Sequence, residues 1–302
     1  MVIIPEGEQP FIQSIDSAWY GHRVAEVAML RLDVVHPVVS GNKWYKLKHN
    51  IQYCLDNHIN TILTFGGAYS NHLVATAAAA QLYGVQSVGI VKGKYAETNL
   101  TPTLKSCIAY GMDLQFVTNE EYEKKNDGAW LQQLSEKHHQ AFTIPEGGAN
   151  EMGRAGAGDI AALIPERFTH IAISVGTGTT LAGVLNNLKQ DATVIGFAPM
   201  KGGAYLNEEV REYVLPDKRQ QYIIYDDWHF GGFGKHTEGL VAFMNEFYGH
   251  HNIPLDMVYT AKMMFGLREQ IMNGLYPETA KILCVHTGGL QGNLSIKDRL
   301  VY

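Results

Sequence analysis

The feature that most limits how this chain can fold is a repeated order of short apolar segments, polar turns and helical segments. Strand-like apolar segments lie at residues 61–65, 87–91, 113–117, 141–144, 170–175, 194–198 and 281–285. Patterns typical of helices lie at residues 74–82, 103–110, 122–138, 155–164, 181–188 and 259–273. Consecutive parallel strands need long crossover connections, and helices usually supply them. The sequence therefore predicts an α/β fold with mostly parallel sheets flanked by helices.

The same order indicates two domains. The chain has 302 residues, which is more than one simple core usually holds. Several strand–helix units fall between about residues 48 and 150. They are too many to form one portion of a single sheet. We expect residues 48–151 to form a small α/β domain inserted into a large domain of residues 1–47 and 152–302.

The composition argues against several classes of protein. The net charge of −6 comes without a basic stripe, so nucleic acid is not an expected partner. Cys54, Cys107 and Cys284 are far apart, which argues against a disulfide framework and a zinc site, and we expect no metal. These cysteines and the lack of a signal-peptide pattern favour a cytoplasmic location. No stretch approaches the 18 consecutive apolar residues of a membrane span.

Lys43 is the first residue with chemical meaning. It follows an apolar, β-branched stretch at residues 34–39, which we expect to be a strand, and a Gly-Asn turn, and it opens a helical segment. Ligands of α/β folds bind outside the carboxyl ends of strands. A lysine placed there can be desolvated, lose its proton and attack a carbonyl group. A solvated lysine at a helix start is the ordinary alternative.

A glycine- and threonine-rich loop follows the strand expected at residues 170–175. The loop residues are Gly176, Thr177, Gly178, Thr179 and Thr180. Glycines allow close approach of the backbone, the following helix offers free N–H groups, and the hydroxyls add donors. These are the properties of a phosphate site, although the spacing matches neither a Walker A loop nor a dinucleotide fingerprint. A plain strand-to-helix turn is the alternative.

A second loop, Gly66-Gly67 followed by Ser70, Asn71 and His72, enters the Ala-rich helix. Its N–H groups and the Ser70 hydroxyl could bind a carboxylate. Ser and Asn are also the usual residues of a helix N-cap, so an ordinary cap is an equal alternative.

Two further loops follow strands. His286-Thr287-Gly288-Gly289 places a hydroxyl, that of Thr287, at a strand end, where it could meet a ring nitrogen. Residues 145–150 could border the same site or could only turn the chain. A nucleophilic lysine, a phosphate cradle, a carboxylate site and a hydroxyl for a ring nitrogen together fit pyridoxal 5'-phosphate chemistry.

These motifs resemble those of pyridoxal-phosphate enzymes of fold type II. More narrowly, the chain is similar to the 1-aminocyclopropane-1-carboxylate deaminase/D-cysteine desulfhydrase family, from Ser40 to about Asn293. The resemblance implies a two-domain fold with a large cofactor-binding domain, a homodimer and a small amino-acid substrate. It implies that Lys43 forms the Schiff base with the cofactor.

The resemblance also implies the roles of the remaining site residues. The catalytic residues would be Lys43, Ser70 and Tyr259. The cofactor would be held by Lys43, Lys46, Asn71, Gly176, Thr177, Gly178, Thr179, Thr180 and Thr287. The substrate would be bound by Ser70, Asn71, His72, Phe233 and Tyr259, with its carboxylate on Ser70, Asn71 and His72.

Four positions bear on the branch of the family. Cyclopropane deaminases carry Glu and Leu where this chain has Thr260 and Thr287, and the D-cysteine desulfhydrase branch is similar to this chain there. Phe233 stands where the family has a tyrosine, and His72 stands where the cyclopropane deaminases have glutamine. A neutral hydroxyl strengthens the electron sink of the ring less than a carboxylate does. The resemblance therefore favours β-elimination of D-cysteine to pyruvate, sulfide and ammonia.

Three alternatives remain open from the sequence. One is the cyclopropane deaminase reaction, which yields 2-oxobutyrate and ammonia. Another is a cofactor-binding protein whose activity is weak or lost, because Phe233 lacks the hydroxyl of the family tyrosine. The third is a nicotinamide-dependent enzyme that uses the Gly176 loop.

Overall fold

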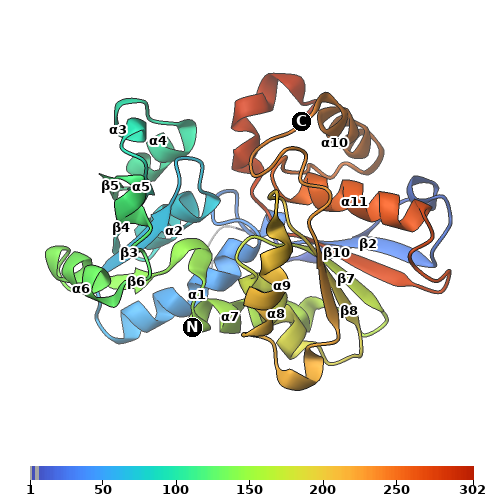
Figure 1. The fold of residues 1–302 in the computed structure, drawn as a ribbon, viewed down its shortest axis with the longest axis horizontal. Coiled ribbons are helices and arrows are strands. Elements are labelled where there is room, and N and C mark those ends of the chain that lie inside the picture. Colours follow the sequence, from blue (N-terminus) through green and yellow to red (C-terminus); the bar gives the residue numbers. More distant parts are fainter. Residues whose placement is uncertain (1, 4–6) are drawn as a thin grey trace.

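The computed structural model describes residues 2, 3 and 7–302, and it shows an α/β fold with two parallel-stranded lobes (Figure 1). The strands are β1 (Phe11–Ser14), β2 (Glu26–Arg31), β3 (Thr61–Gly66), β4 (Gln86–Lys92), β5 (Met112–Val117), β6 (Phe142–Ile144), β7 (His170–Ser174), β8 (Thr193–Phe197), β9 (Tyr222–Tyr225) and β10 (Lys281–His286). The helices are α1 (Asn42–Asp56), α2 (Asn71–Leu82), α3 (Tyr95–Thr98), α4 (Pro102–Ala109), α5 (Asn119–Tyr122), α6 (Gly128–Lys137), α7 (Glu151–Gly158), α8 (Thr179–Asn187), α9 (Leu206–Arg211), α10 (Glu238–His251) and α11 (Thr260–Met272).

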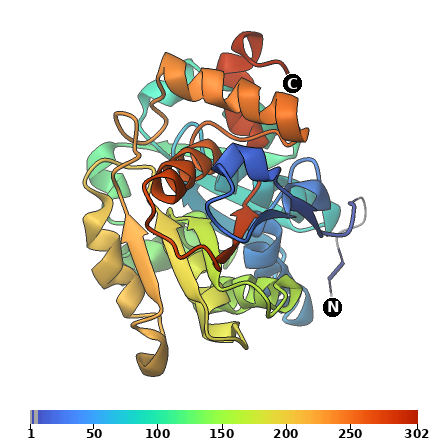
Figure 2. The same ribbon diagram turned by 90° about the vertical axis from the view of Figure 1, so that its right-hand side faces the viewer.

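The large lobe is a six-stranded sheet with the order β1-β2-β10-β7-β8-β9. Among the described strands of this sheet, β1 alone runs antiparallel to its neighbour, and the other pairs are parallel. Helices α10 and α11 cover one face of the sheet, and α1, α7 and α8 pack against the other (Figures 1 and 2). Both faces are therefore buried, which explains why β7, β8 and β10 are nearly continuous apolar runs.

The small lobe is a four-stranded parallel sheet with the order β5-β4-β3-β6. Helices α2 and α4 pack on one face, and α5 and α6 pack on the other. Helix α2 begins at the N-cap Ser70, whose hydroxyl accepts a hydrogen bond from the Leu73 amide, and its alanines allow it to lie close to the sheet. The strands of this sheet lie between β2 and β7 in the sequence, so the small lobe is an insertion in the large one.

The fold class agrees with the sequence prediction, but two local expectations were wrong. Residues 34–39 are not a strand: they form the end of a 3₁₀ turn (Asp33–Val35) and a loop through Pro37, and the strand before Lys43 is β2. His36 Nδ1 accepts the amide hydrogens of Val38 and Val39, which holds this stretch as a turn. The helix expected at residues 122–138 is interrupted between α5 and α6.

The expected domain limits stay a prediction. The limit at residues 47 and 48 lies inside α1, which packs on α7 as well as on α2.

Among the described residues, no helix is both long enough and apolar enough to cross a membrane.

Candidate functional site

Lys43 lies in the first turn of α1, at the junction of the two lobes. Gly41 caps the helix with a φ angle of 61°, and a side chain there would meet the Thr287 carbonyl oxygen at 2.0 Å. The Asn42 amide donates to that carbonyl at 3.3 Å. The helix that carries the lysine therefore begins directly on the loop after β10.

The amine of Lys43 is partly desolvated. Burial lowers its pKa to about 8, although the carboxylate of Asp256 acts in the opposite direction. Its Nζ donates to Asn42 Oδ1 at 3.1 Å, and Asn42 Nδ2 donates to Thr180 Oγ1 at 2.8 Å. One asparagine thus connects the lysine to the start of α8. An amine with this pKa is readily available as a neutral nucleophile or base near pH 8.

The second lysine of α1, Lys46, lies one turn further on and is buried. Its Nζ donates to the Gly147 carbonyl at 3.0 Å and to Thr177 Oγ1 at 3.5 Å. Burial and the nearby Lys43 both lower its pKa well below the usual value. Through these contacts, residues 145–150 lie beside the Gly176 loop. The sequence had left open whether these residues border the site or only turn the chain.

The loop from Gly176 to Thr180 has the form of an anion cradle. Gly178 has a φ angle of 71° and is the N-cap of α8, with no side chain to occupy the free N–H groups. A Cβ at this position would lie 2.2 Å from Val210 Cγ2, so only glycine fits. The Thr177 and Thr179 hydroxyls lie 2.8 Å apart. The helix N-terminus, the threonine hydroxyls and the Lys46 amine meet here, as phosphate binding requires.

His72 is buried in the first turn of α2. Thr64 Oγ1 donates its one hydrogen to the Ile144 carbonyl, so it accepts from His72 Nε2 at 2.9 Å. His72 Nδ1 is then an acceptor, and it has no partner among the described residues. Burial, and then the charges of Lys43 and Lys46, lower the His72 pKa well below its ordinary value. The neutral ring offers a lone pair here, which suits a hydrogen-bond donor better than a carboxylate.

Asn71 lies beside the loop that follows β10. Its Nδ2 donates to the Gly289 carbonyl at 3.5 Å, and a Cβ on Gly289 would lie 2.8 Å from the same nitrogen. The Asn71 Oδ1 atom is buried and has no partner within the described part of the chain. Ser70, the N-cap next to it, keeps partial exposure.

Tyr259 and Phe233 form an aromatic pair above the Gly176 loop. The ring centroids are 5.7 Å apart with an angle of 77° between the planes. The Tyr259 ring lies 3.5 Å from the position of a Cβ on Gly176. Burial, followed by the charge of Asp256, raises the pKa of Tyr259, so its phenol stays protonated.

The two threonines that bear on the family branch differ in their surroundings. Thr260 Oγ1 donates to Asp256 Oδ2 at 2.7 Å, so its hydrogen is in use. Thr287 is buried directly after β10; its carbonyl accepts the Asn42 amide hydrogen, whereas no hydrogen bond of its hydroxyl is found among the described residues. Of these two threonines, therefore, only Thr287 has a hydroxyl that is free for a ligand.

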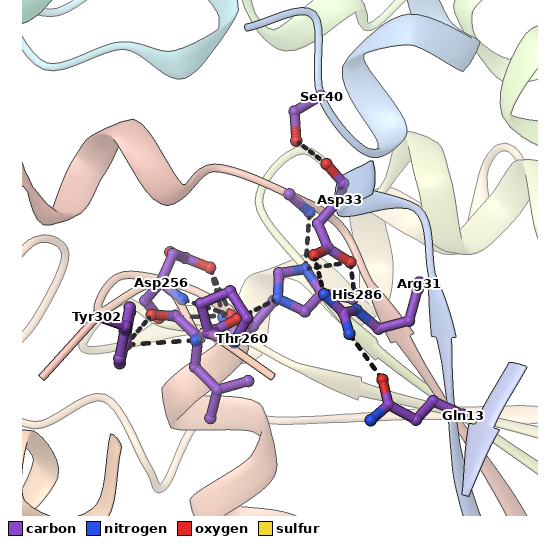
Figure 3. A network of polar contacts seen from close by, with 11 residues as sticks. Gln13, Arg31, Asp33, Ser40, Asp256, Thr260, His286 and Tyr302 are labelled. Carbon is purple, nitrogen blue, oxygen red and sulfur yellow. Dashed lines mark hydrogen bonds and ion pairs between the residues drawn. The ribbon is translucent and has the colours of Figure 1, made fainter. Parts of the chain in front are cut away.

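A buried polar network connects the segments next to these loops (Figure 3). Arg31 donates to both carboxylate oxygens of Asp33, at 2.8 and 2.7 Å, and the Ser40 hydroxyl donates to the Asp33 carbonyl. His286 Nε2 donates to the Pro254 carbonyl at 2.6 Å, and its Nδ1 lies 3.7 Å from Asp33 Oδ1. The network thus links the segments that lead to Lys43, Thr287 and Tyr259.

The residues present fit pyridoxal phosphate. Two buried acceptors without partners among the described residues, Asn71 Oδ1 and His72 Nδ1, lie in the first turn of α2, and a ligand with donors would satisfy them. The cradle after β7 suits its phosphate, and Lys43 suits its aldehyde. A dinucleotide would use neither the lysine nor the free Thr287 hydroxyl.

The structure brings nearly all of the residues expected from the sequence to the carboxyl ends of the two sheets. Sequence reasoning missed the Gly147 carbonyl, the Asp33–Arg31 pair and His286, which act through backbone positions or through other side chains. Ser174, a buried hydroxyl without a partner among the described residues, was also missed. The sequence marks His286 only by its place in the His-Thr-Gly-Gly segment.

Comparison with known proteins defines the class. The family model described as "Pyridoxal-phosphate dependent enzyme" matches residues 17–288. The chain therefore belongs to the family of pyridoxal-phosphate-dependent enzymes, and pyridoxal phosphate is its cofactor.

Individual relatives narrow the comparison. A "Putative 1-aminocyclopropane-1-carboxylate deaminase" of Thermotoga maritima is 30% identical over 90% of this chain and 91% of its own length. A "D-cysteine desulfhydrase" of Klebsiella pneumoniae is 27% identical over 89% of this chain and 88% of its own. The solved structure of an "ACC deaminase homologue" has a TM-score of 0.82 and 25% identity, and the match covers 99% of this chain and 94% of the other.

Proposed function

We propose that this protein catalyses β-elimination of a small amino acid, with D-cysteine as the substrate. D-Cysteine and water would give pyruvate, hydrogen sulfide and ammonia, which balances all atoms. The observation that carries the proposal is the pair of threonines: position 260 has no carboxylate, and Thr287 offers a neutral hydroxyl for the ring nitrogen. Loss of a thiolate leaving group needs less stabilisation of negative charge than opening of a cyclopropane ring.

Lys43 would act first as the attachment point and then as the base. When bound, pyridoxal phosphate supplies an aldehyde for this amine and a ring that withdraws electrons from the substrate. Released by the substrate amine, Lys43 would take the proton from the substrate Cα, because its pKa of about 8 suits proton transfer near neutral pH. Asn42 would hold the Nζ atom in place during both tasks.

The remaining side chains would hold and orient. Lys46, Thr177, Gly178, Thr179 and Thr180, with Gly176, would hold the phosphate. Ser70 and Asn71 would bind the substrate carboxylate. His72 belongs to the same substrate site, where its Nδ1 would accept a hydrogen bond from a donor of the bound ligand. Tyr259, whose phenol stays protonated, would lie close to the reacting atoms.

The test combines absorbance with product analysis. The purified protein should show a visible band of the bound cofactor that disappears in Lys43→Ala. Lys48→Ala is the matched control: it is on the same helix but pairs with Asp159 at 2.7 Å, and it should keep the band. D-Cysteine should then release sulfide and pyruvate. Release of 2-oxobutyrate from 1-aminocyclopropane-1-carboxylate at a rate equal to D-cysteine turnover would refute the proposed reaction.

A homodimer and a cytoplasmic location belong to the same proposal, since both rest on the resemblance. Sedimentation equilibrium of the holoenzyme tests the dimer, and a mass of one chain would reject it. Fractionation of the native cells tests the location.

A further inference from the structure

Lys262 is a buried lysine that the proposed reaction does not use. Its side chain is 1% exposed, and its Nζ donates to three backbone carbonyls: Pro199 at 3.2 Å, His229 at 2.9 Å and Gly232 at 2.9 Å. An ammonium has three hydrogens, so its capacity to donate is used completely. A buried charge is tolerated only with such full compensation. Its position is therefore fixed by the segments that supply the carbonyls.

Two of these carbonyls belong to one loop, residues 226–237, which joins β9 to α10. The same face of α11 holds this loop at two further places. Gly266 gives room to the Trp228 ring, since a Cβ there would lie 2.6 Å from it, and Glu269 accepts from Trp228 Nε1 at 2.6 Å. Lys262, Gly266 and Glu269 are four and three residues apart, which puts them in line along the helix.

The backbone of the loop does not have a regular structure of its own. Phe230, Gly231, Gly232 and Gly234 all have positive φ angles, of 51°, 95°, 121° and 70°. Residues in this conformation keep it where the surroundings hold them. The ammonium of Lys262 donates to the carbonyls of His229 and Gly232, which flank the Phe230–Gly231 pair.

The tip of the loop is Phe233, whose ring lies edge-on against Tyr259 and is 56% exposed. Tyr259 immediately precedes α11, three residues before Lys262. The helix end that carries the tyrosine of the proposed site thus also fixes the loop that covers it. Phe233 has no polar atom, so it offers a substrate only an apolar or sulfur contact.

We propose that Lys262 is a positioning residue that fixes the loop of residues 226–237, and that Phe233 at its tip thereby determines which substrate side chains the site accepts. The loop favours an uncharged β-substituent attached through sulfur, because a carboxylate placed against the apolar Phe233 ring would lack a partner there. This substrate preference rests on the proposed function, whereas the anchoring of the loop does not.

Limited proteolysis of the cofactor-free protein tests the anchoring without any activity. Lys235 is exposed and lies two residues beyond Phe233. In Lys262→Met, trypsin should cut after Lys235 about tenfold faster than in the wild type, since the released loop opens more often. Lys235→Met is the control: it should remove this cut and leave the activity unchanged. Equal rates of cutting in wild type and Lys262→Met would overturn the proposal.

A second variant covers the case in which Lys262→Met does not fold. Lys262→Gln keeps two hydrogens to donate, so it should be cut at a rate between those of wild type and a fully released loop. A rate equal to that of the wild type in this variant would also contradict the anchoring.

Steady-state kinetics test the substrate preference. In Lys262→Met and in Phe233→Ala, KM for D-cysteine should rise about tenfold while kcat changes less than about threefold, since a positioning contact is lost and the reacting groups remain. In Phe233→Ala, the preference for S-methyl-D-cysteine over S-carboxymethyl-D-cysteine, whose leaving group carries a carboxylate, should fall. An unchanged KM in both variants would overturn the role of Phe233. If the wild type releases no sulfide, the proposed function fails, and the proteolysis result still decides the anchoring.

Discussion

The hydroxyl of Thr260 donates a hydrogen bond of 2.7 Å to the carboxylate of Asp256, and the Asp256 amide donates back to the same hydroxyl at 2.8 Å. Asp256 also accepts the amide hydrogens of Val258, Tyr259 and Thr260. The pair therefore closes the turn that precedes α11 and fixes Tyr259. Since the hydrogen of Thr260 is used inside this turn, Thr287 is the residue that we propose for the contact with a ring nitrogen.

Removal of the Thr260 hydroxyl tests this closed turn. Thr260→Val should lower the free energy of unfolding by about 2–3 kcal/mol, because a buried amide and a buried carboxylate each lose a partner. Thr260→Ser keeps the hydroxyl and should cost about 1 kcal/mol or less. Urea denaturation of both variants gives the comparison. Equal losses in the two variants would contradict the larger contribution that we expect from the hydroxyl.

The pKa of Lys43 can be measured by acylation of the cofactor-free protein. As the pH rises, the neutral amine should form with a midpoint of about 8, because burial favours the uncharged form, against 10.5 for an ordinary lysine. Mass spectrometry of the peptide that contains Lys43 gives the rate at each pH. The same peptide in the urea-unfolded protein is the control and should titrate at the higher value.

A single substitution should move that midpoint. Asn42→Asp places a negative charge 3.1 Å from Nζ and should raise the pKa of Lys43. A midpoint near that of the unfolded protein already in the wild type would contradict the desolvation of this amine.

The fit of Gly178 predicts a large effect of one methyl group. Gly178→Ala should destabilise the protein by about 2–4 kcal/mol, because it combines a left-handed backbone with a contact of 2.2 Å to Val210. It should also weaken binding of the cofactor phosphate. Gly176→Ala is the matched stability control, since its methyl would meet Tyr259 at an ordinary 3.5 Å and should cost less than about 1 kcal/mol. Thermal unfolding of both variants without cofactor measures the difference.

Asp33 predicts a stability difference that depends on pH. Burial alone would raise the pKa of this carboxyl, but His286 and Arg31 outweigh it and lower the pKa below its usual value. A lowered folded-state pKa contributes stability that is present above the unfolded value of about 4 and is lost as the pH falls through the folded one.

The variant that measures this contribution is Asp33→Asn. Its free energy of unfolding at pH 7 should be about 3–5 kcal/mol lower than that of the wild type, since Arg31 stays buried without its carboxylate partner. The difference in free energy of unfolding between the two proteins should become smaller below about pH 4. Asp56→Asn, an exposed position, should show no such loss. A gap that stays constant down to pH 2 would contradict the ionised state of Asp33.

The Gly176–Thr180 loop stands out in the sequence because its glycines and hydroxyls directly follow a strand, β7, where ligands of parallel sheets bind. Lys43 stands out by its Gly-Asn turn and helix start, although the strand before it is β2, which ends at Arg31, and not residues 34–39. Parallel sheets bury both faces, so β7, β8 and β10 were readable as apolar runs. The pairing of these strands across large sequence distances then brings the loops together.

Other parts depend on contacts that no local pattern contains. The stretch at residues 34–39 reads as a strand by its valines, yet the lone pair of His36 and the ring of Pro37 make it a turn. The state of His72 follows from Thr64 and the Ile144 carbonyl, and both come from neighbouring strands of the small sheet. The strands β1, β2 and β9 were missed because they are short or lie at the edge of an apolar pattern.

The contact between the start of α1, which carries Lys43, and the loop after β10 has a consequence for synthesis of the chain. Ribosomes build a protein from its N-terminus, and α1 emerges early, but its first amide hydrogen bonds to the carbonyl of Thr287 near the other end. The nascent chain thus contains Lys43 long before it contains Thr287, whose carbonyl accepts the first amide hydrogen of α1. On the proposed role of Lys43, capture of the cofactor is a late event that requires β10, and a chain truncated before this strand would lack the carbonyl on which α1 begins.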